Sequence, residues 1–298
     1  MKKSNSYLII FLILSFTAVK ISSQTRTMSS LLWEIRKDGN TNVSYIFGTN
    51  HLISGALIDT SEKINEIMSN VKELVCEVSE PGYDTLKMIR SMILSRDEEY
   101  IFKDSNEKKM VKDFIEEKTN RSFSSFENLK PMVMLLTLEY FYYLKLNPDC
   151  SKKNYESTDK YFMNTAKKLG KDIIGLETAD EQMSILFDSI PFSIQLKSLI
   201  SFIKWEKLNS FLMQNIDSCY KEMDYDCVCQ YDYFSKFGGQ TKGILLDNRN
   251  LRWIDKLADL TENNPVMIAV GLGHLGGKNG LLNLFKEKGY SVTPVMLN

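Results

Sequence analysis

Short apolar runs separated by polar turns predict a strand-rich segment over residues 31–78. Residues 31–35 and 43–47 are apolar runs on either side of a polar turn that contains an Asp-Gly pair, which is typical of a β-hairpin. Residues 60–70 follow with helical spacing and a polar start. Residues 74–78 form another short apolar run. The order predicted here is strand, strand, helix, strand.

The pattern becomes helical over residues 84–168. The stretch LKPMVMLLTLEYFYYLKL is apolar on most of its faces, which predicts a buried helix. The stretch STDKYFMNTAKKLG predicts another helix, which ends at Gly170. Residues 190–260 are again mostly helical in pattern.

Further strands are predicted between and after these helical stretches. Residues 173–176 predict a strand, and Thr178 and Glu181 after it have the spacing of a helix-capping box. The end of the chain predicts a strand over 266–270, a helix over 280–288 and a strand over 291–296. We therefore expect an α/β fold: a central mixed β-sheet flanked by helices, with a large helical insertion in the middle of the chain (about 84–168), in a single domain over 24–298.

The first residues have the pattern of a secretory signal peptide. Lys2 and Lys3 precede an apolar run over 7–19, and small residues follow up to Ser23. The run is too short for a comfortable membrane span. We therefore predict a signal peptide over residues 1–23, export to the periplasm or the extracellular space, and no stable membrane span after cleavage. An uncleaved anchor is the alternative.

Export makes disulfides possible. Cys76 lies in an apolar, strand-like run, which favours a buried thiol. The other four cysteines lie in polar contexts and could make two disulfides in three connectivities: Cys150, Cys219, Cys227 and Cys229. A metal-binding cysteine cluster is the weaker alternative, because Cys227 and Cys229 form C-x-C rather than C-x-x-C.

The charge balance argues against a nucleic-acid partner. The chain has 37 basic and 38 acidic residues and no basic patch with interleaved aromatic residues. A quarter of the residues are charged, as in an ordinary globular protein.

The chain has only two histidines, His51 and His274, and both occur in the same local pattern. Each follows a glycine by three positions, Gly48 or Gly271, and each glycine ends a predicted strand. Glycine permits a sharp turn and a close backbone approach. The carboxyl ends of strands in α/β sheets are where ligands gather. We therefore expect the two imidazoles to meet at one edge of the sheet.

Two glutamates and an arginine have matching placement. Glu77 lies near the end of the strand predicted over 74–78, and Glu177 directly follows the strand over 173–176. A His–His–Glu set with one open position can hold a divalent metal and activate water. Arg249 could stabilise an oxyanion or orient a carboxylate.

Other interpretations compete for these residues. Glu80 could take the role proposed for Glu77. Glu181 is better interpreted as a helix cap. Arg249 could instead be a surface residue paired with Asp247 or Asp255. The GGKNG stretch is interpreted as a flexible loop rather than an anion site. No H-E-x-x-H, G-x-S-x-G or P-loop occurs, so nothing indicates a nucleophile.

These stretches together resemble the TraB/GumN family, which is grouped with the Tiki metalloproteases and more distantly with ChaN-like and erythromycin-esterase-like proteins. The resemblance extends over about 31–295 and rests on YIFGTNHL, VCEVSE, GLETADEQ, DNRNLRW and VGLGHLGGKNGLLNLFKEKGYSVTPV. The paired G-x-x-H motifs are its most specific feature. Asn50, before His51, is one departure from the family pattern.

The resemblance implies an α/β core and a metal-dependent hydrolase of the peptidase type. The residues that match the family motifs are Gly48 and His51, Glu77, Glu177 and Glu181, Arg249 and Asn250, and Gly271 and His274.

We therefore predict an exported metal-dependent hydrolase that acts on a peptide or small amide. His51, His274 and Glu77 would hold one divalent cation (Mn, Co or Zn), Glu177 or Glu77 would be the general base, and Arg249 would stabilise the oxyanion. One alternative is a non-catalytic protein that binds a peptide, a metal or haem. Another is metal-independent hydrolysis with a histidine as the base.

Overall fold

The computed structural model describes residues 29–79, 84–151, 155–231 and 238–297. The predicted signal peptide and Glu80 lie outside the described residues.

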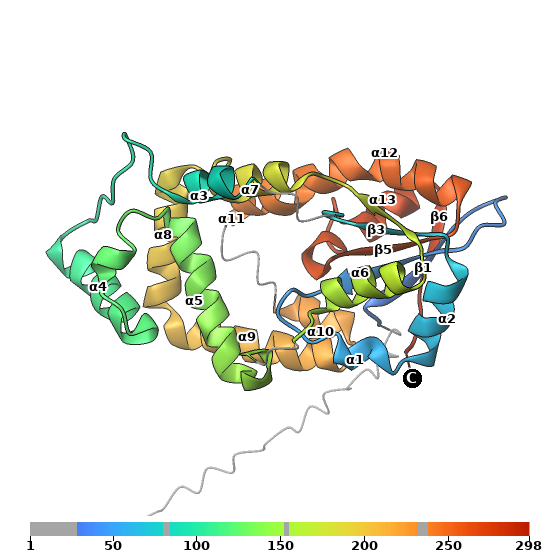
Figure 1. The fold of residues 1–298 in the computed structure, drawn as a ribbon, viewed down its shortest axis with the longest axis horizontal. Helices are drawn as coiled ribbons and strands as arrows, with labels where there is room; N and C mark the ends of the chain where they lie inside the picture. Colours follow the sequence, from blue (N-terminus) through green and yellow to red (C-terminus); the bar gives the residue numbers. More distant parts are fainter. Residues whose placement is uncertain (1–28, 80–83, 152–154, 232–237, 298) are drawn as a thin grey trace, which may run out of the picture.

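Six strands of the described chain form one mixed sheet, with the order β4-β3-β5-β2-β1-β6 (Figure 1). The four strands from β4 to β2 run parallel, whereas β1 is antiparallel to both of its neighbours, β2 and β6. The expected central mixed sheet is therefore confirmed. The strands are β1 (Leu32–Lys37), β2 (Ser44–Thr49), β3 (Glu73–Cys76), β4 (Asp172–Gly175), β5 (Val266–Gly271) and β6 (Tyr290–Pro294).

Strand β5 lies between β3 and β2, and its residues from Val266 to Val270 are all buried. A parallel strand that is covered on both faces needs apolar residues at every position rather than at alternate ones. This explains the continuous VMIAV run. Strand β2 extends to Thr49, two residues beyond its predicted end, so Gly48 lies within the strand and not after it.

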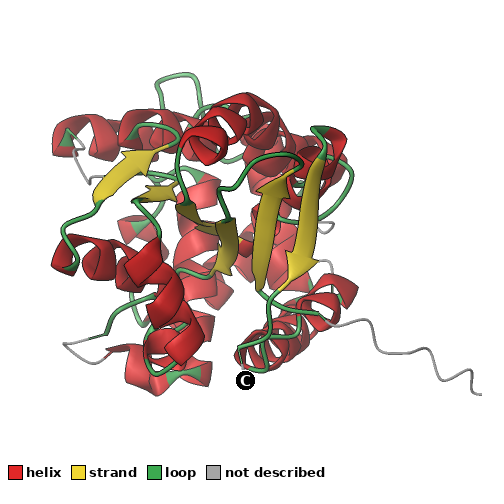
Figure 2. Cartoon of the chain, turned by 90° about the vertical axis from the view of Figure 1, so that its right-hand side faces the viewer, coloured by secondary structure: helices red, strands yellow, loops and turns green. Residues whose placement is uncertain are grey.

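Helices cover both faces of the sheet (Figures 1 and 2), with α12 and α13 on one side and α2 and α6 on the other. Their apolar faces meet the strands in one core, which includes Phe47, Phe162, Trp253 and Phe285. The helices around the sheet are α1 (Ala56–Asp59), α2 (Glu62–Asn70), α6 (Thr158–Lys168), α12 (Asn248–Asn263) and α13 (Leu281–Glu287).

Most of the remaining helices form a helical half beside the sheet (Figure 1), with a second core that includes Val111, Leu135, Leu199 and Phe202. Tyr220 and Tyr225 belong instead to the core of the sheet. The expected helical region in the middle of the chain is confirmed, although α6 at its end packs on the sheet, and the segment between β4 and β5 adds further helices. The remaining helices are α3 (Thr85–Met92), α4 (Ser105–Thr119), α5 (Pro131–Leu146), α7 (Ala179–Phe187), α8 (Phe192–Lys204), α9 (Glu206–Lys221), α10 (Tyr225–Gln230) and α11 (Gly238–Lys242). The short helical turns of the described chain are η1 (Phe123–Ser125), η2 (Pro148–Ser151), η4 (Gly243–Asp247) and η5 (Leu272–His274).

The start of α7 has the predicted capping box. The Glu181 side chain accepts a hydrogen bond from the Thr178 backbone N–H (2.7 Å), and the Thr178 hydroxyl accepts one from the Glu181 backbone N–H (3.2 Å). The Glu181 side chain is thus used as a helix cap, as expected.

The described chain forms one disulfide, fewer than the two that the sequence allows for Cys150, Cys219, Cys227 and Cys229. Cys219 and Cys227 are joined by a disulfide that links the end of α9 to α10. The second bridge does not form: Cys150 remains a thiol whose Sγ lies 3.5 Å from the Leu52 carbonyl oxygen. Cys76 is a buried thiol, as predicted, and burial raises its pKa to about 12.

Within the described part of the chain, no single helix has the length and apolar composition to cross a membrane. One bent pair, α7 with α8, meets those two criteria when its helices are taken together. Both helices contribute buried residues to the second core, among them Phe187 and Leu199.

Candidate functional site

The candidate residues gather where four parallel strands end. His51 follows β2, Glu77 follows β3, Glu177 follows β4 and His274 follows β5. Because these strands are parallel neighbours, their carboxyl ends lie along one edge of the sheet. This edge faces the helical half (Figure 1).

The two motif glycines permit close packing rather than a sharp turn. Neither Gly48 nor Gly271 has a positive φ, which corrects the expected turn role. A Cβ at Gly48 would lie 2.5 Å from the Leu272 side chain, which belongs to the other G-x-x-H segment. A Cβ at Gly271 would lie 3.0 Å from Glu77 Oε1. The glycines therefore let the two segments touch each other and let Glu77 approach β5.

Arg249 is the centre of a buried charge network. Its Nη2 atom donates to Glu77 Oε2 at 2.6 Å and to Glu177 Oε1 at 2.5 Å, and its Nε donates to Glu177 Oε2 at 3.1 Å. The Glu177 side chain is only 3% exposed and the Arg249 side chain 7%. The alternative of a surface arginine is therefore wrong. Asp247, one of the two partners considered for it, pairs with Lys242 instead.

A local irregularity places Arg249 in this position. The π-helical turn η4 directly precedes α12, and the Leu245 carbonyl within it accepts a hydrogen bond from Arg249 Nη1 at 2.9 Å. One turn further along α12, the Trp253 ring packs against both the guanidinium and the His274 ring, each at 4.6 Å. Such π-helical turns are common at functional sites.

The hydrogen bonds of His274 assign its tautomer. Asn250 Nδ2 donates to the carbonyl oxygens of His274 and Asn279, so its Oδ1 faces His274 Nδ1 at 2.6 Å as an acceptor. The proton is therefore assigned to Nδ1, and Nε2 carries the lone pair. Arg249 Nη1 lies 3.0 Å from Nε2 and donates to it, and Glu77 Oε1 lies 3.6 Å from it. The bond from Asn250 to Asn279 also ties the GGKNG segment, for which the sequence predicts a flexible loop, to α12.

Burial and charge act in opposite directions on these pKa values. Burial lowers the pKa of His274 to about 4 despite the nearby Glu77 carboxylate, so the ring is neutral at pH 7. Burial also tends to raise the pKa of Glu77, but the positive charges of His274, Arg249 and His51, together with the Gly271 N–H, bring it down to about 2. Because His274 is neutral at pH 7, Arg249 is the buried charge that keeps Glu77 ionised. Burial raises the pKa of Glu177.

His51 lies at the same edge but has a different partner. Its side chain is 68% exposed, and its Nδ1 atom lies 2.9 Å from Asp159 Oδ2. The negative charge of Asp159 raises the pKa of His51 to about 9. Asp159 Oδ1 in turn accepts a hydrogen bond from the Thr49 hydroxyl at 2.5 Å. Among the described residues, no hydrogen bond or ion pair joins His51 directly to Glu77 or His274.

The start of α6 holds the His51 turn in place. The Thr158 hydroxyl accepts a hydrogen bond from the Asn50 backbone N–H at 2.8 Å and lies 3.0 Å from the Asn50 carbonyl oxygen, to which it can donate. The Tyr220 hydroxyl donates to the Gly48 carbonyl at 2.8 Å. A segment more than 100 residues further along the chain therefore determines where His51 lies.

Two residues of the site were not predicted. Asp159 lies in the first turn of a predicted helix, where acidic residues are common, and no local pattern marks it as a partner of His51. Gln182 donates to Glu77 Oε2 at 2.9 Å and belongs to the GLETADEQ stretch. Its helical position on α7 could have indicated this contact only if the neighbouring strand had been known.

The types of side chain at this edge fit a divalent metal, but in the described chain they do not converge on a common point. No group of three His, Cys, Asp or Glu side chains in the described chain has the arrangement of a metal site. Glu77 Oε1 and His274 Nε2 are adjacent, but Arg249 donates to the lone pair of that nitrogen. Binding of a cation there would require Arg249 to release His274.

Comparison with known proteins identifies the family of the chain. The sequence model of the TraB/PrgY/gumN family matches residues 31–294, which is nearly the whole chain. No curated protein and no solved structure matches the chain.

Proposed function

We propose, from the premise that the chain belongs to the TraB/PrgY/gumN family, that it is an exported metal-dependent hydrolase of peptides or small amides. His51, His274 and Glu77 would hold one divalent cation, such as Mn, Co or Zn. The predicted signal segment supports export to the periplasm or the extracellular space, and so does the disulfide Cys219–Cys227, because such bridges persist in oxidising compartments.

The orientation of the two imidazoles is the observation that carries this proposal. Metal-binding histidines nearly always use the second ring nitrogen to donate to an acceptor, which fixes the tautomer and the ring orientation. His274 Nδ1 faces the Asn250 amide oxygen, and His51 Nδ1 faces Asp159. Both rings therefore have a partner at Nδ1, which leaves Nε2 as the ligand atom once Arg249 releases His274 and His51 loses its second proton.

The other polar groups have separate tasks in this proposal. When bound, a divalent cation supplies a Lewis acid that makes water a nucleophile near neutral pH. Glu77 stays ionised at neutral pH and contributes negative charge. Arg249 neutralises that charge, and its guanidinium can stabilise the oxyanion that forms on an attacked carbonyl.

Glu177 orients Arg249 and is also the better proton acceptor of the two carboxylates. It accepts hydrogen bonds from two guanidinium nitrogens. Its raised pKa favours proton uptake, in contrast to the lowered pKa of Glu77. To act as a general base, Glu177 would exchange one Arg249 contact for the proton of water.

A chelation experiment tests the proposed activity. The purified full-length protein would be incubated with a peptide library before chelation, after chelation, and after addition of Mn, Co or Zn. We expect cleavage that is lost on chelation and restored by at least one metal. Cleavage that resists complete removal of the metal would contradict the proposal.

Asp159→Asn tests whether Asp159 positions His51. The exchange keeps an acceptor for Thr49 but removes the charge beside His51 Nδ1. We expect about a 10- to 100-fold loss of metal affinity, because such outer-shell carboxylates contribute that much. Metal titration followed by spectroscopy with cobalt would measure the loss. Asp172→Asn, at the exposed start of β4, is the control and should bind metal as the wild type does. Wild-type affinity in Asp159→Asn would exclude the positioning role.

One observation favours metal-independent hydrolysis as a second candidate. Arg249 already occupies the lone pair of His274 Nε2, and the His51–Asp159 pair can transfer a proton. Because the pKa of His51 is about 9, it would act as a base at alkaline pH. Chelator-resistant turnover that is lost in His51→Gln would identify this mechanism. A chain that binds peptides or metal with no turnover would instead be a binding protein.

A further inference from the structure

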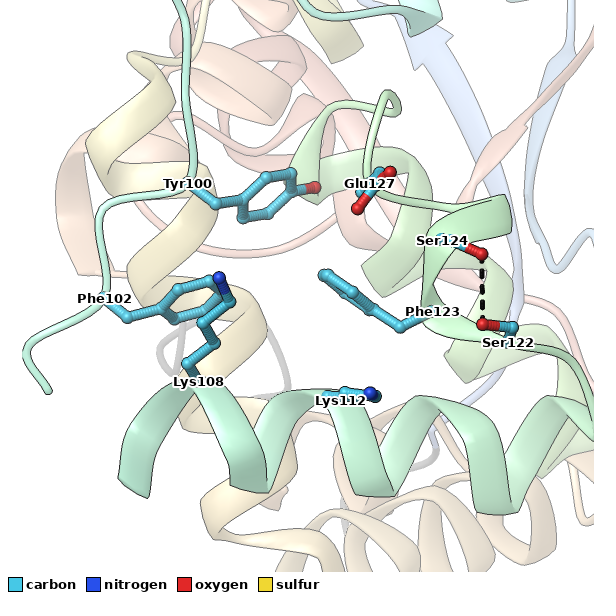
Figure 3. Close-up of a pocket in the computed structure, with 8 residues that line it drawn as sticks. All are labelled: Tyr100, Phe102, Lys108, Lys112, Ser122, Phe123, Ser124 and Glu127. Atoms are coloured by element: carbon cyan, nitrogen blue, oxygen red, sulfur yellow. Dashed lines mark hydrogen bonds between the residues drawn. The ribbon is translucent and has the colours of Figure 1, made fainter. Parts of the chain in front are cut away.

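The helical half contains a cavity of about 280 Å³ that lies outside the candidate site (Figure 3). It is lined by three aromatic rings, two lysines, two serines and one glutamate. These residues come from α4, from the η1 turn and from the segments next to them. In Figure 1, α4 lies at the opposite end of the molecule from strand β6.

Contacts that the aromatic residues make with one another and with neighbouring segments hold the walls in place. The Tyr100 hydroxyl donates to the Leu129 carbonyl at 2.5 Å, and the Tyr100 ring stacks on Phe102 with centroids 5.8 Å apart. The Phe123 backbone N–H donates to the Glu116 carboxylate at 2.9 Å, and the Phe123 ring meets Tyr100 edge-on. Because these contacts fix the walls, binding needs little ordering of the protein.

The lysines of the cavity differ from other lysines on α4 in having no carboxylate partner. Lys109 and Lys118 pair with carboxylates. Lys108 and Lys112 are one helical turn apart and both line the cavity, yet neither lies within 4.0 Å of a carboxylate oxygen in the described chain. Glu127 likewise has no basic partner among the described residues. The cavity therefore offers positive and negative groups that remain available to a ligand.

The two charges lie on different walls. Figure 3 shows Lys108 rising from α4 beside Phe102, whereas Glu127 lies next to Tyr100 on the side away from α4. The aromatic rings separate these groups. A ligand with a negative end, a flat apolar body and a positive end matches this order.

We propose that this cavity binds a small zwitterion with an aromatic side chain, such as a free aromatic amino acid. The ligand carboxylate would pair with Lys108 and Lys112, its ammonium group with Glu127, and its ring would pack against Phe102 and Phe123. The volume of about 280 Å³ lies just below the range of about 300 to about 1,000 Å³ that is usual for ligand sites, and this favours a single amino acid over a longer peptide.

Calorimetric titration of the full-length protein with L-phenylalanine tests this proposal. For a ligand of about 12 non-hydrogen atoms, we expect a dissociation constant of about 1 mM. The double variant Lys108→Gln with Lys112→Gln should bind at least about tenfold more weakly, because it loses charge-assisted contacts to the carboxylate. The control Lys109→Gln lies on the same helix outside the cavity and should bind as the wild type does.

Two ligand derivatives separate a zwitterion site from a simple anion site. N-acetyl-L-phenylalanine lacks the ammonium group, and L-phenylalaninamide lacks the carboxylate. Both should bind the wild-type protein several-fold more weakly than L-phenylalanine. In Glu127→Gln, the acetyl derivative and L-phenylalanine should bind equally well. No saturable binding of L-phenylalanine to the wild type, or equal binding of all three compounds, would overturn the proposal.

Discussion

Arg249→Met should lower the free energy of unfolding by about 3–5 kcal/mol, because it leaves two buried carboxylates without their shared cation. Glu77 and Glu177 both accept hydrogen bonds from the guanidinium, and both are nearly inaccessible to water. His274 would also lose the donor to its Nε2 atom. Methionine fills a similar volume, so the expected loss comes from unpaired charge rather than from a cavity.

Arg252→Met is the matched control for this prediction. Arg252 lies one turn along the same helix, is 58% exposed and approaches Glu177 only to 3.9 Å. Its removal should change stability by less than about 1 kcal/mol. Urea unfolding followed by circular dichroism would measure both variants. Equal stability of the two variants would show that Arg249 does not neutralise the buried carboxylates.

Removal of both imidazoles should reduce metal affinity by more than about 100-fold, because ligand atoms contribute more than the outer-shell groups that orient them. His51 and His274 supply the only imidazoles of the chain, so no other histidine can replace them. Glutamine retains a polar side chain at each position but lacks the imidazole nitrogen that transition metals prefer.

The single variants separate binding from folding. His51 is exposed, so His51→Gln should change stability by no more than about 0.5 kcal/mol while it weakens metal binding. His274 is buried between Trp253 and Asn250, so His274→Gln also disturbs packing. Glu181→Gln is the control for both, because Gln can still cap α7 and Glu181 has no contact with either histidine.

The sheet was predictable because each of its strands carries a local signal. The VMIAV run of β5 is apolar on both faces, and the first two strands flank an Asp-Gly turn. Most predicted ends lie within two residues of those in the structure. The end of β2 differs because Gly48 and Thr49 still pair with Val270 and Gly271 of β5, a long-range contact that no local pattern contains.

The candidate site was predictable only in part, because its residues are joined by contacts between distant segments. Parallel strands bring their carboxyl ends to one edge, so Glu77, Glu177 and His274 follow from the strand pattern. Asp159 does not, because its meeting with His51 depends on how α6 returns to the sheet after the helical insertion. The burial of Arg249 also depends on the π-helical turn η4, which has no recognised sequence pattern.

The metal content of the purified full-length protein, wild type beside the His51→Gln, His274→Gln double variant, tests the central claim most directly. Both proteins would be incubated with Mn, Co or Zn, desalted and measured by elemental analysis, with Glu181→Gln as the control. The account predicts about one equivalent of metal in the wild type and the control, and almost none in the double variant. An equal metal content in the wild type and the double variant, or none in any protein, would contradict it.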